Sequence, residues 1–164
     1  MWKVKKSKIH SNGVFAKKNI KKNTQIIQYI GEIVTKAEGD RRSSVRIKKF
    51  TNSRQNGSVY IFELNKKYDI DGFVNRNKAR FINHSCSPNC EVDIVNDKIW
   101  ISSIKNIKKG EELSYDYGYA FDPDDFRDHV CKCGSKNCIG FIISSDEWKK
   151  YLKYIKRIIN KKNK

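Results

Sequence analysis

The sequence has no apolar run approaching the roughly 20 residues that a membrane-spanning helix needs. Its basic first ten residues lack the apolar stretch of a secretory signal peptide. Proline is scarce, at 2 of 164 residues, and no repeat or Pro- or Gly-rich linker divides the chain. These absences argue against a membrane or secreted protein. They favour a single intracellular domain that is long enough to bury a core.

Acidic residues are also few. The 18 Asp and Glu stand against 35 Lys and Arg, which gives a formal charge of +17. Such a chain is expected to associate with polyanions, including nucleic acid, unless its charge is balanced locally. A nucleotide bias in the coding genome accounts for the abundant Lys, Asn and Ile equally well. Composition alone therefore leaves a nucleic-acid partner open.

The pattern along the chain predicts a mainly β fold with short helices. Compact apolar or β-branched segments at residues 13–16, 24–30, 58–64 and 113–117 are typical of short strands. Residues 91–101 predict a hairpin that turns at Asn96 and Asp97.

Two further segments break this pattern. Residues 35–57 are polar with weak periodicity and predict a helical or loop insertion, and residues 70–72 predict a turn. Near the C-terminus, Ser144 and Glu147 form a potential capping box. An apolar series at helical spacing then follows: Trp148, Leu152, Ile155 and Ile159.

This C-terminal helix carries eight Lys and Arg and no acid from Lys149 onward. We interpret it as a packing helix with a solvated basic face, in preference to a dedicated nucleic-acid contact.

Residues 80–90 (RFINHSCSPNC) combine polar side chains, thiols and a proline without an amphipathic period. Such a segment is costly to bury unless each polar group has a partner. Taken alone, it is equally consistent with a core turn. Residues 110–119 (GEELSYDYGY) supply a second unusual segment, rich in tyrosine and acid.

Together these two segments resemble the signature motifs of the SET-domain protein lysine methyltransferases. Residues 9–16 (IHSNGVFA) resemble that family's opening segment for S-adenosylmethionine (SAM), and residues 29–32 (YIGE) resemble a strand end. Residues 60–62, Asp71 and residues 77–80 continue the likeness, which spans roughly residues 8–142. It is strongest to the trithorax/MLL-like branch.

The resemblance implies small curved β-sheets with a pseudoknot that packs the NHSC and YDYG segments together. It also implies a SET domain over residues 1–120 and a post-SET zinc-binding segment over 121–143. The basic amphipathic helix expected over 144–164 from its spacing follows these two. The implied activity is transfer of a methyl group from SAM to a protein lysine. Two other readings stay open: an inactive SET-fold module that binds peptides, and a zinc-dependent nucleic-acid binder.

Site residues follow from the resemblance by position. The implied catalytic residues are Tyr117, Tyr115 and His84. The implied cofactor-binding residues are His10, Asn12, Tyr29, Tyr60, Asn83, His84 and Lys132. Ser11 replaces a glycine usual in the family. Serine makes this turn if its φ stays negative, so we expect altered cofactor affinity.

The chemistry agrees with these roles. A lysine, with an ordinary pKa of about 10.4, must lose its proton before it accepts a methyl group. A sulfonium and an apolar channel both disfavour the ammonium form. Tyrosine hydroxyls and carbonyl oxygens can then orient the amine. Tyr115 stands at the family's Phe/Tyr switch, which predicts mono- or dimethylation. The alternative is that Tyr60, Tyr115 and Tyr117 are core residues.

The five cysteines favour metal or free thiols over disulfides in a reducing compartment. Cys131, Cys133 and Cys138 supply three thiolates, one short of a closed tetrahedral zinc site. The family completes such a site with the NHSC cysteine, which is Cys86 here. Cys90 is the competing fourth ligand, and one bound zinc is expected.

Charge reverses between Glu111 and Asp128, where seven acids and one base give −6 and leave +23 elsewhere. We expect this acidic segment either to attract a basic, histone-like peptide or to be a solvated loop. The remaining basic surface is expected to hold nucleic acid or to serve solubility. In a eukaryote or a targeted host cell, these partners imply a nuclear or chromatin-associated protein. The oligomeric state is open.

Overall fold

The computed structural model describes residues 1–50 and 60–162, which form two compact units that interleave in the sequence. The first unit comprises Met1–Asn83 and Asn89–Leu113, and the second comprises His84–Pro88 and Ser114–Lys164. Predictions for residues 51–59 lie outside the described residues. In the described part, no helix is long and apolar enough to cross a membrane.

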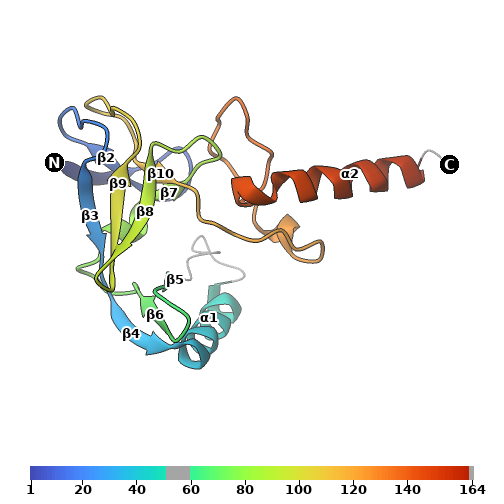
Figure 1. Ribbon diagram of the computed structural model, residues 1–164, viewed down its shortest axis with the longest axis horizontal. Coiled ribbons are helices and arrows are strands. Elements are labelled where there is room, and N and C mark those ends of the chain that lie inside the picture. Colours follow the sequence, from blue (N-terminus) through green and yellow to red (C-terminus); the bar gives the residue numbers. More distant parts are fainter. Residues whose placement is uncertain (51–59, 163–164) are drawn as a thin grey trace. The chain divides into compact units, whose positions relative to one another are not determined.

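The first unit is built on a three-stranded antiparallel sheet of β3 (Gln25–Tyr29), β9 (Lys98–Ser103) and β8 (Cys90–Val95) (Figure 1). Central β9 buries Ile99 and Ile101 completely. This confirms the strand predicted at 24–30 and the hairpin predicted at 91–101. The hairpin turn has positive φ at both central residues, the backbone that a two-residue type I′ turn requires.

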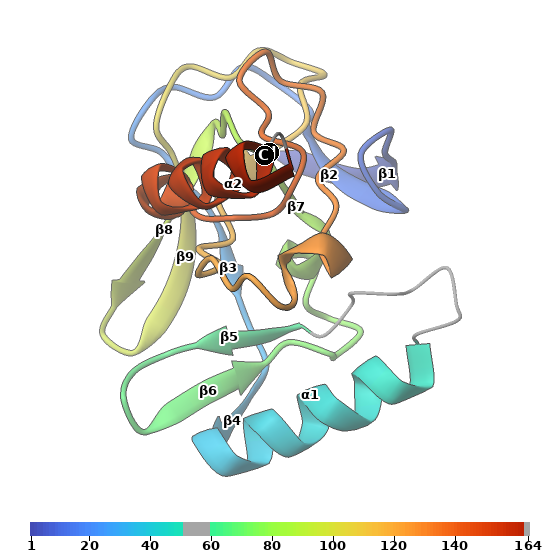
Figure 2. The ribbon, with the colours of Figure 1, turned by 90° about the vertical axis from the view of Figure 1, so that its right-hand side faces the viewer.

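A second sheet orders β4 (Glu32–Thr35), β6 (Tyr68–Asp71) and β5 (Ile61–Glu63), and α1 (Lys36–Phe50) runs alongside it (Figure 2). The predicted insertion is therefore helical over its described part. The predicted turn at 70–72 is wrong, because Ile70 and Asp71 belong to the central strand β6. Polar residues before a glycine suggested a turn, but here the polar residues are buried in ion pairs.

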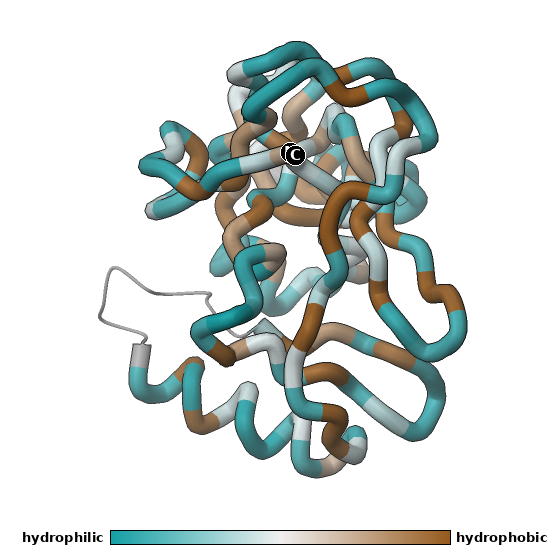
Figure 3. Tube along the Cα trace, turned by 90° about the vertical axis from the view of Figure 1, so that its left-hand side faces the viewer, coloured by the Kyte–Doolittle hydropathy of each residue, from teal (hydrophilic) through white to brown (hydrophobic). Residues whose placement is uncertain are grey.

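Helix α1 is largely hydrophilic and has little apolar surface to pack against this sheet (Figure 3). Ion pairs attach it instead. Arg42 and Arg46 contact the buried Asp71 carboxylate at 2.8 and 2.7 Å. Lys36 contacts the buried Asp69 at 2.7 Å. Burial alone raises the pKa of Asp71, but hydrogen bonds from the two arginines outweigh it and lower that pKa to about 2. Charge pairing, rather than an apolar stripe, thus fixes the position of α1.

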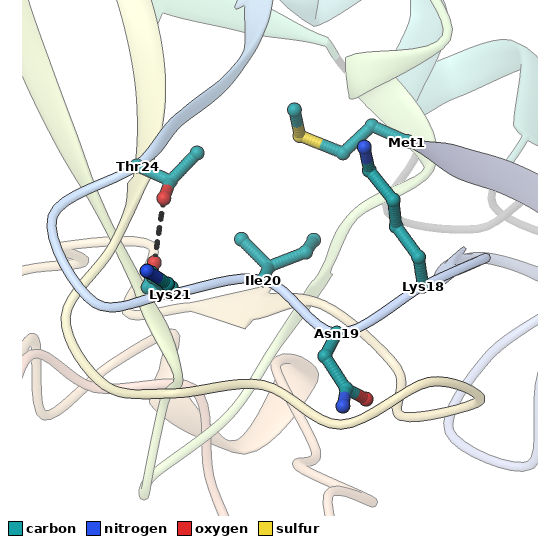
Figure 4. Close-up of a pocket in the computed structure, with 6 residues that line it drawn as sticks. All are labelled: Met1, Lys18, Asn19, Ile20, Lys21 and Thr24. Atoms are coloured by element: carbon teal, nitrogen blue, oxygen red, sulfur yellow. Dashed lines mark hydrogen bonds between the residues drawn. The ribbon is translucent and has the colours of Figure 1, made fainter.

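A separate antiparallel pair joins β1 (Trp2–Lys6) to β2 (Asn12–Ala16). Buried Val14, Phe15 and Ala16 confirm the strand predicted at 13–16. Strand β1 was not predicted, although its sequence WKVKK alternates apolar and basic residues. Beside this pair is a shallow hollow that contains none of the predicted site residues (Figure 4). It is lined by Met1, Lys18, Asn19, Ile20, Lys21 and Thr24.

The second unit is mostly loops. Its strand β10 (Ser114–Tyr115) pairs with β7 (Asn83–His84), of which His84 belongs to this unit. Its short 3-10 turns cover Phe126–Asp128 and Ser145–Glu147, and a third such turn, Ala79–Phe81, lies in the first unit. Its core consists of three aromatic residues and one isoleucine, called here the aromatic cluster: Phe121, Phe126, Tyr151 and Ile143. The rings of Phe121 and Tyr151 lie 5.6 Å apart, edge to face.

Helix α2 (Trp148–Lys162) confirms the predicted C-terminal helix, with two corrections. The capping box does not form, because the Ser144 side chain makes no cap bond and Glu147 instead accepts hydrogen bonds from Phe121 N–H and Lys150. The buried stripe runs through Tyr151, whereas the predicted core residues Leu152 and Ile159 are about half exposed, at 49% and 52%. The aromatic cluster decides which face is buried.

Candidate active site and metal centre

The NHSC and YDYG segments come together in the second unit. The Tyr117 N–H donates to His84 Nδ1 at 3.2 Å, and the Ser85 N–H donates to the Tyr115 carbonyl at 3.2 Å. The rings of His84 and Tyr117 meet edge to face, with centroids 5.4 Å apart. About 30 residues separate the two segments in sequence, so this juxtaposition is a property of the fold.

His84 is buried, and its protonation follows from its contacts. A backbone N–H can only donate, so Nδ1 must accept from Tyr117 and the proton is on Nε2. Burial lowers the pKa of His84, and the Asp116 carboxylate 3.8 Å from Nδ1 opposes that shift. The neutral ring directs Nε2–H toward Cys86 Sγ at 3.7 Å. His84 thus connects the tyrosine segment to the thiol cluster.

A row of aromatic rings continues from His84. The Tyr115 and Tyr117 centroids lie 5.0 Å apart, and Tyr119 follows Tyr117 at 5.9 Å. His129 then meets Tyr119 edge to face at 5.2 Å. Burial raises the pKa of Tyr119, which keeps its phenol protonated. Sequence reasoning missed Tyr119 and His129, although the aromatic residue directly after YDYG was a usable signal.

Four cysteines of the second unit form a compact cluster: Cys86, Cys131, Cys133 and Cys138. Their sulfurs lie within 4.8 Å of one another, with Cys86 at 3.8 Å from Cys131 and 3.9 Å from Cys138. A regular ZnS4 tetrahedron with Zn–S bonds of about 2.3 Å has edges of about 3.8 Å. All five cysteines are in the described part of the chain, and none forms a disulfide. The cluster could therefore hold a metal ion.

The surroundings of the cluster fit a metal centre as well. The Gly140 N–H donates to Cys138 Sγ at 3.4 Å, and Asn137 Nδ2 donates to the Cys86 carbonyl at 3.2 Å. Such outer contacts orient metal ligands. Cys90, the competing ligand, belongs to the first unit and donates its thiol to Asn89 Oδ1. It is not among the four clustered residues.

Burial raises the pKa values of Cys86 and Cys131, because a charged thiolate is poorly solvated there. Burial also opposes ionisation of Cys133, but hydrogen bonds with Ser135 outweigh it and lower that pKa to about 6. Several thiolates this close repel one another without a cation. A divalent ion would remove that repulsion and favour the ionised form of every ligand.

In the first unit, the Asn83 side-chain amide binds the backbone of residues 9–16, the segment that resembles the family's opening motif. Asn83 Nδ2 donates to the carbonyls of Asn12 at 3.0 Å and His10 at 3.4 Å, and to Glu112 Oε1 at 2.7 Å. Ser7 Oγ holds the same carboxylate at 2.7 Å. Glu112 was not among the predicted site residues. It fixes the orientation of Asn83, a predicted cofactor-binding residue.

Backbone geometry in the opening segment adds two constraints. A Cβ at Gly13 would lie 2.2 Å from Glu112 Oε1, so only glycine leaves room for that carboxylate. Ser11 has φ of +43°, in the left-handed region. The expectation of a negative φ at Ser11 is therefore wrong: the serine adopts the conformation for which glycine is preferred, at a cost of roughly 1–2 kcal/mol.

Tyr29 and Tyr60 form a second pair in the first unit. The Tyr29 hydroxyl donates to the Tyr60 carbonyl at 2.9 Å, and the Tyr60 ring stacks on Phe73 at 5.7 Å. Tyr29 also packs against Gly72, where a Cβ would lie 2.3 Å from its hydroxyl oxygen. Tyr29 thereby supports the backbone of Tyr60, whose φ is +59°. Lys132, in the second unit, is exposed between Cys131 and Cys133.

Comparison with known proteins identifies this arrangement. A family model described as SET domain matches residues 11–118. The chain belongs to the SET-domain family. The resemblance seen in the sequence is thus confirmed, and the matched range includes Asn83, Glu112 and the His84–Tyr117 contact.

Relatives of this SET domain belong to the MLL/trithorax type. Histone-lysine N-methyltransferase 2D of Homo sapiens is 39% identical over 137 residues, covering 81% of this chain and 2% of that protein. Histone-lysine N-methyltransferase, H3 lysine-4 specific, of Schizosaccharomyces pombe is 37% identical over 140 residues, covering 83% and 14%. Histone-lysine N-methyltransferase trithorax of Drosophila virilis is 37% identical over 137 residues, covering 81% and 3%. The chain thus spans only a small part of each relative's length.

The SET-domain match ends at Gly118, and two features follow it in the sequence. Three of the four clustered cysteines follow that residue, as does the whole of α2. The thiol cluster therefore joins Cys86 of the SET domain to a segment beyond the matched range.

Proposed function

We propose that this chain is a SAM-dependent protein-lysine N-methyltransferase that mono- or dimethylates a basic, histone-like protein. The observation that carries the proposal is the contact of the NHSC and YDYG segments, with Tyr117 N–H bound to His84 Nδ1. Relatives named histone-lysine N-methyltransferases support it at 37–39% identity. Chromatin is the corresponding location, since histones are found there.

Bound SAM would supply an activated methyl group on a positively charged sulfonium. Tyr117 is the residue we assign to orient the target amine, because its backbone is fixed by the neutral His84 ring. Tyr115 and Tyr119 flank it. Loss of water from a narrow channel and the positive sulfonium would both disfavour the charged ammonium. In-line transfer gains most of its rate from such alignment.

Cofactor binding is proposed for His10, Asn12, Tyr29, Tyr60, Asn83, His84 and Lys132. The hydrogen bonds of Asn83 to the His10 and Asn12 carbonyls support part of this set. The Tyr29–Tyr60 bond supports another part. Lys132 is assigned through its backbone, because its side chain is exposed.

We further propose that the thiol cluster binds one zinc ion. Four sulfurs within 4.8 Å match a structural zinc site, in which every coordination position is filled by protein. The ion would tie Cys86, two residues from His84, to the segment from Cys131 to Cys138. It would thereby stabilise the backbone that orients His84.

The acidic segment 111–128 is the region we assign to attract a basic substrate. Its residues Asp122, Asp124, Asp125 and Asp128 are exposed. The Asp125 carboxylate lies 3.8 Å from Nε2 of His129, at the end of the aromatic row. Exposed carboxylates raise the local concentration of a cationic peptide without contacting the reacting atoms.

The test is methylation of mixed histones with radiolabelled SAM, followed by a peptide array and mass spectrometry of the products. We expect labelled lysine in a basic sequence. Tyr117→Phe should reduce kcat by about 100-fold, which is typical for loss of one orienting group. Tyr68→Phe, an exposed tyrosine on β6, is the matched control and should keep full activity.

Absence of methylation, with histone peptides still bound, would instead support an inactive peptide-binding module. Binding of nucleic acid with neither methylation nor peptide binding would support the zinc-dependent nucleic-acid binder.

A further inference from the structure

Helix α2 carries seven Lys and Arg and no acidic residue. Six of them have described side chains, and all six are exposed: Lys149, Lys150, Lys153, Lys156, Arg157 and Lys161. At 100° per residue these positions fall on one continuous side of the helix, opposite the buried Tyr151. The basic residues thus form a single face, called here the α2 basic face.

The second unit does not neutralise this face. Lys150 pairs with Glu147 at 3.0 Å and also donates to the Phe121 carbonyl. Within the described part of the chain, the other five side chains form no ion pair. The acidic segment 111–128 belongs mainly to the same unit, yet none of its carboxylates reaches α2. Five cations are therefore available to an external partner.

Such a face is unfavourable for a helix that serves only to pack. Lys149, Lys153, Arg157 and Lys161 form a ladder at a spacing of four residues. Each like-charged pair at this spacing costs a few tenths of a kcal/mol. Cations in the first turn also oppose the helix dipole. Alternating Glu and Lys would remove both the repulsion between like charges and the unfavourable interaction with the dipole. The uniform positive charge therefore indicates a polyanionic partner.

Packing in the first half of α2 holds the basic face rigid. Trp148, Tyr151, Tyr154 and Ile155 pack into the aromatic cluster around Phe121 and Phe126. The later turns extend beyond the loops of this unit (Figure 1). A helix of 15 residues is about 22 Å long, which spans several phosphates of a duplex. The cations are thus preorganised along a line.

We propose that the α2 basic face binds the phosphate backbone of double-stranded nucleic acid without sequence preference. The partner follows from charge complementarity and from the linear array of unpaired cations. This binding is separate from methyl transfer and does not depend on SAM. The sequence alone favoured a solvated face. Five of its cations form no ion pair within residues 1–50 and 60–162, and this reverses that preference.

An anionic membrane surface is the competing partner, because Leu152 and Ile159 are exposed beside the basic residues. A membrane-surface helix buries its apolar face in the lipid. In α2 the larger part of that face packs into the aromatic cluster, with Tyr151 only 7% exposed, and leaves Leu152 and Ile159 half exposed. The structure therefore favours nucleic acid.

The test is fluorescence anisotropy of the full chain with a random duplex of about 30 base pairs, at several salt concentrations. One variant replaces five residues of α2 by Gln: Lys149, Lys153, Lys156, Arg157 and Lys161. A matched control replaces five exposed lysines elsewhere by Gln: Lys3, Lys17, Lys22, Lys66 and Lys98. Both variants remove five positive charges.

We expect the α2 variant to bind about 100-fold more weakly at low salt, with a logarithmic salt slope shallower by about 4. The control should change both values much less. Circular dichroism should show an intact α2, because glutamine is a good helix former and the repulsion is relieved. Methylation of a free peptide should be unchanged, so this test stands apart from that of the proposed function.

Equal losses in the two variants would show that net charge alone governs binding, and would overturn the assignment to α2. Tighter binding to vesicles with anionic lipid than to the duplex would also overturn it, particularly if Leu152→Ser weakened the vesicle binding.

Discussion

Glu112 shows how one carboxylate can organise residues distant from it in sequence. It accepts hydrogen bonds from Asn83 and Ser7, and Gly13 provides the space that it occupies. Its bonds position Asn83, for which cofactor binding is proposed. The absence of a side chain at Gly13 therefore lets the Glu112 carboxylate reach Asn83.

Replacing Glu112 by Gln should weaken SAM binding several-fold and lower stability by about 1–2 kcal/mol, because one acceptor oxygen becomes a donor facing other donors. Isothermal calorimetry and urea unfolding measure the two effects. Glu111→Gln is the matched control, since Glu111 is exposed, and should change stability by less than about 0.5 kcal/mol. Equal effects of the two substitutions would contradict the positioning role.

Tyr115 is the residue expected to set the number of methyl groups added. It is buried beside Tyr117. We propose that its hydroxyl would take up space, or anchor a water, where a further methyl group needs room. Tyr115→Phe should therefore shift products from mono- and dimethyl-lysine toward trimethyl-lysine, as read by mass spectrometry. The control Tyr68→Phe should leave the pattern unchanged. An identical product distribution for Tyr115→Phe and the native protein would refute this role.

Among the helices and strands, α1 depends on ion pairs for its attachment to the β4–β6–β5 sheet. Arg42 and Arg46 lower the pKa of Asp71 to about 2, below its ordinary value of 3.8. The pairing therefore stabilises the fold fully above about pH 4 and loses that contribution as pH falls toward 2, a loss of the order of 2 kcal/mol.

Asp71→Asn should consequently reduce the free energy of unfolding at pH 7 and flatten its decline between pH 5 and 2. Urea denaturation at several pH values measures both effects. Asp97→Asn, at an exposed turn position, is the control and should retain the native slope. A native-like pH profile for Asp71→Asn would exclude the ion pairs as the cause.

The segment from Cys131 to Cys138 has little apolar core of its own, so its order is expected to depend on metal. Chelation should release about one zinc per chain and abolish methylation. Cys138→Ser should lose the metal, whereas Cys90→Ser should retain it, because Cys90 lies outside the cluster. Metal content is read by atomic emission spectroscopy. Retained zinc in Cys138→Ser, or full activity after metal removal, would count against the site.

Across the whole molecule, charge is segregated into an acidic segment, 111–128, with −6 and a remainder with +23. The acidic part is proposed to attract the substrate, and α2 to bind nucleic acid. The two roles make opposite demands on charge, which accounts for their separation along the chain.

Neutralising Asp122, Asp124 and Asp125 with Asn should raise the apparent KM for a basic peptide and flatten its salt dependence, while kcat stays the same. Steady-state kinetics at several ionic strengths measures this. The matched control removes three exposed acids elsewhere: Asp40→Asn, Glu91→Gln and Asp97→Asn. If the control raised KM as much, attraction would depend on total charge rather than on this segment.

The sequence by itself determined the family, the strands with clear apolar patterns and the three closely spaced cysteines, because each is encoded locally. It failed at Ile70 and Asp71, where a turn was predicted. Arginines from α1 pair with the Asp71 carboxylate and allow it to be buried in a central strand. It also failed at Ser11, whose positive φ is fixed by the surrounding fold.

Only the tertiary structure decided which side chains meet. Three contacts join segments at least 29 residues apart in the sequence. They are the approach of Cys86 to the other clustered cysteines, the contact of His84 with Tyr117, and the hydrogen bond of Asn83 to Glu112. Likewise, the buried face of α2 was decided by the aromatic cluster and not by helical periodicity. Local sequence encodes backbone preference, whereas partners for buried polar and charged groups exist only once the chain has folded.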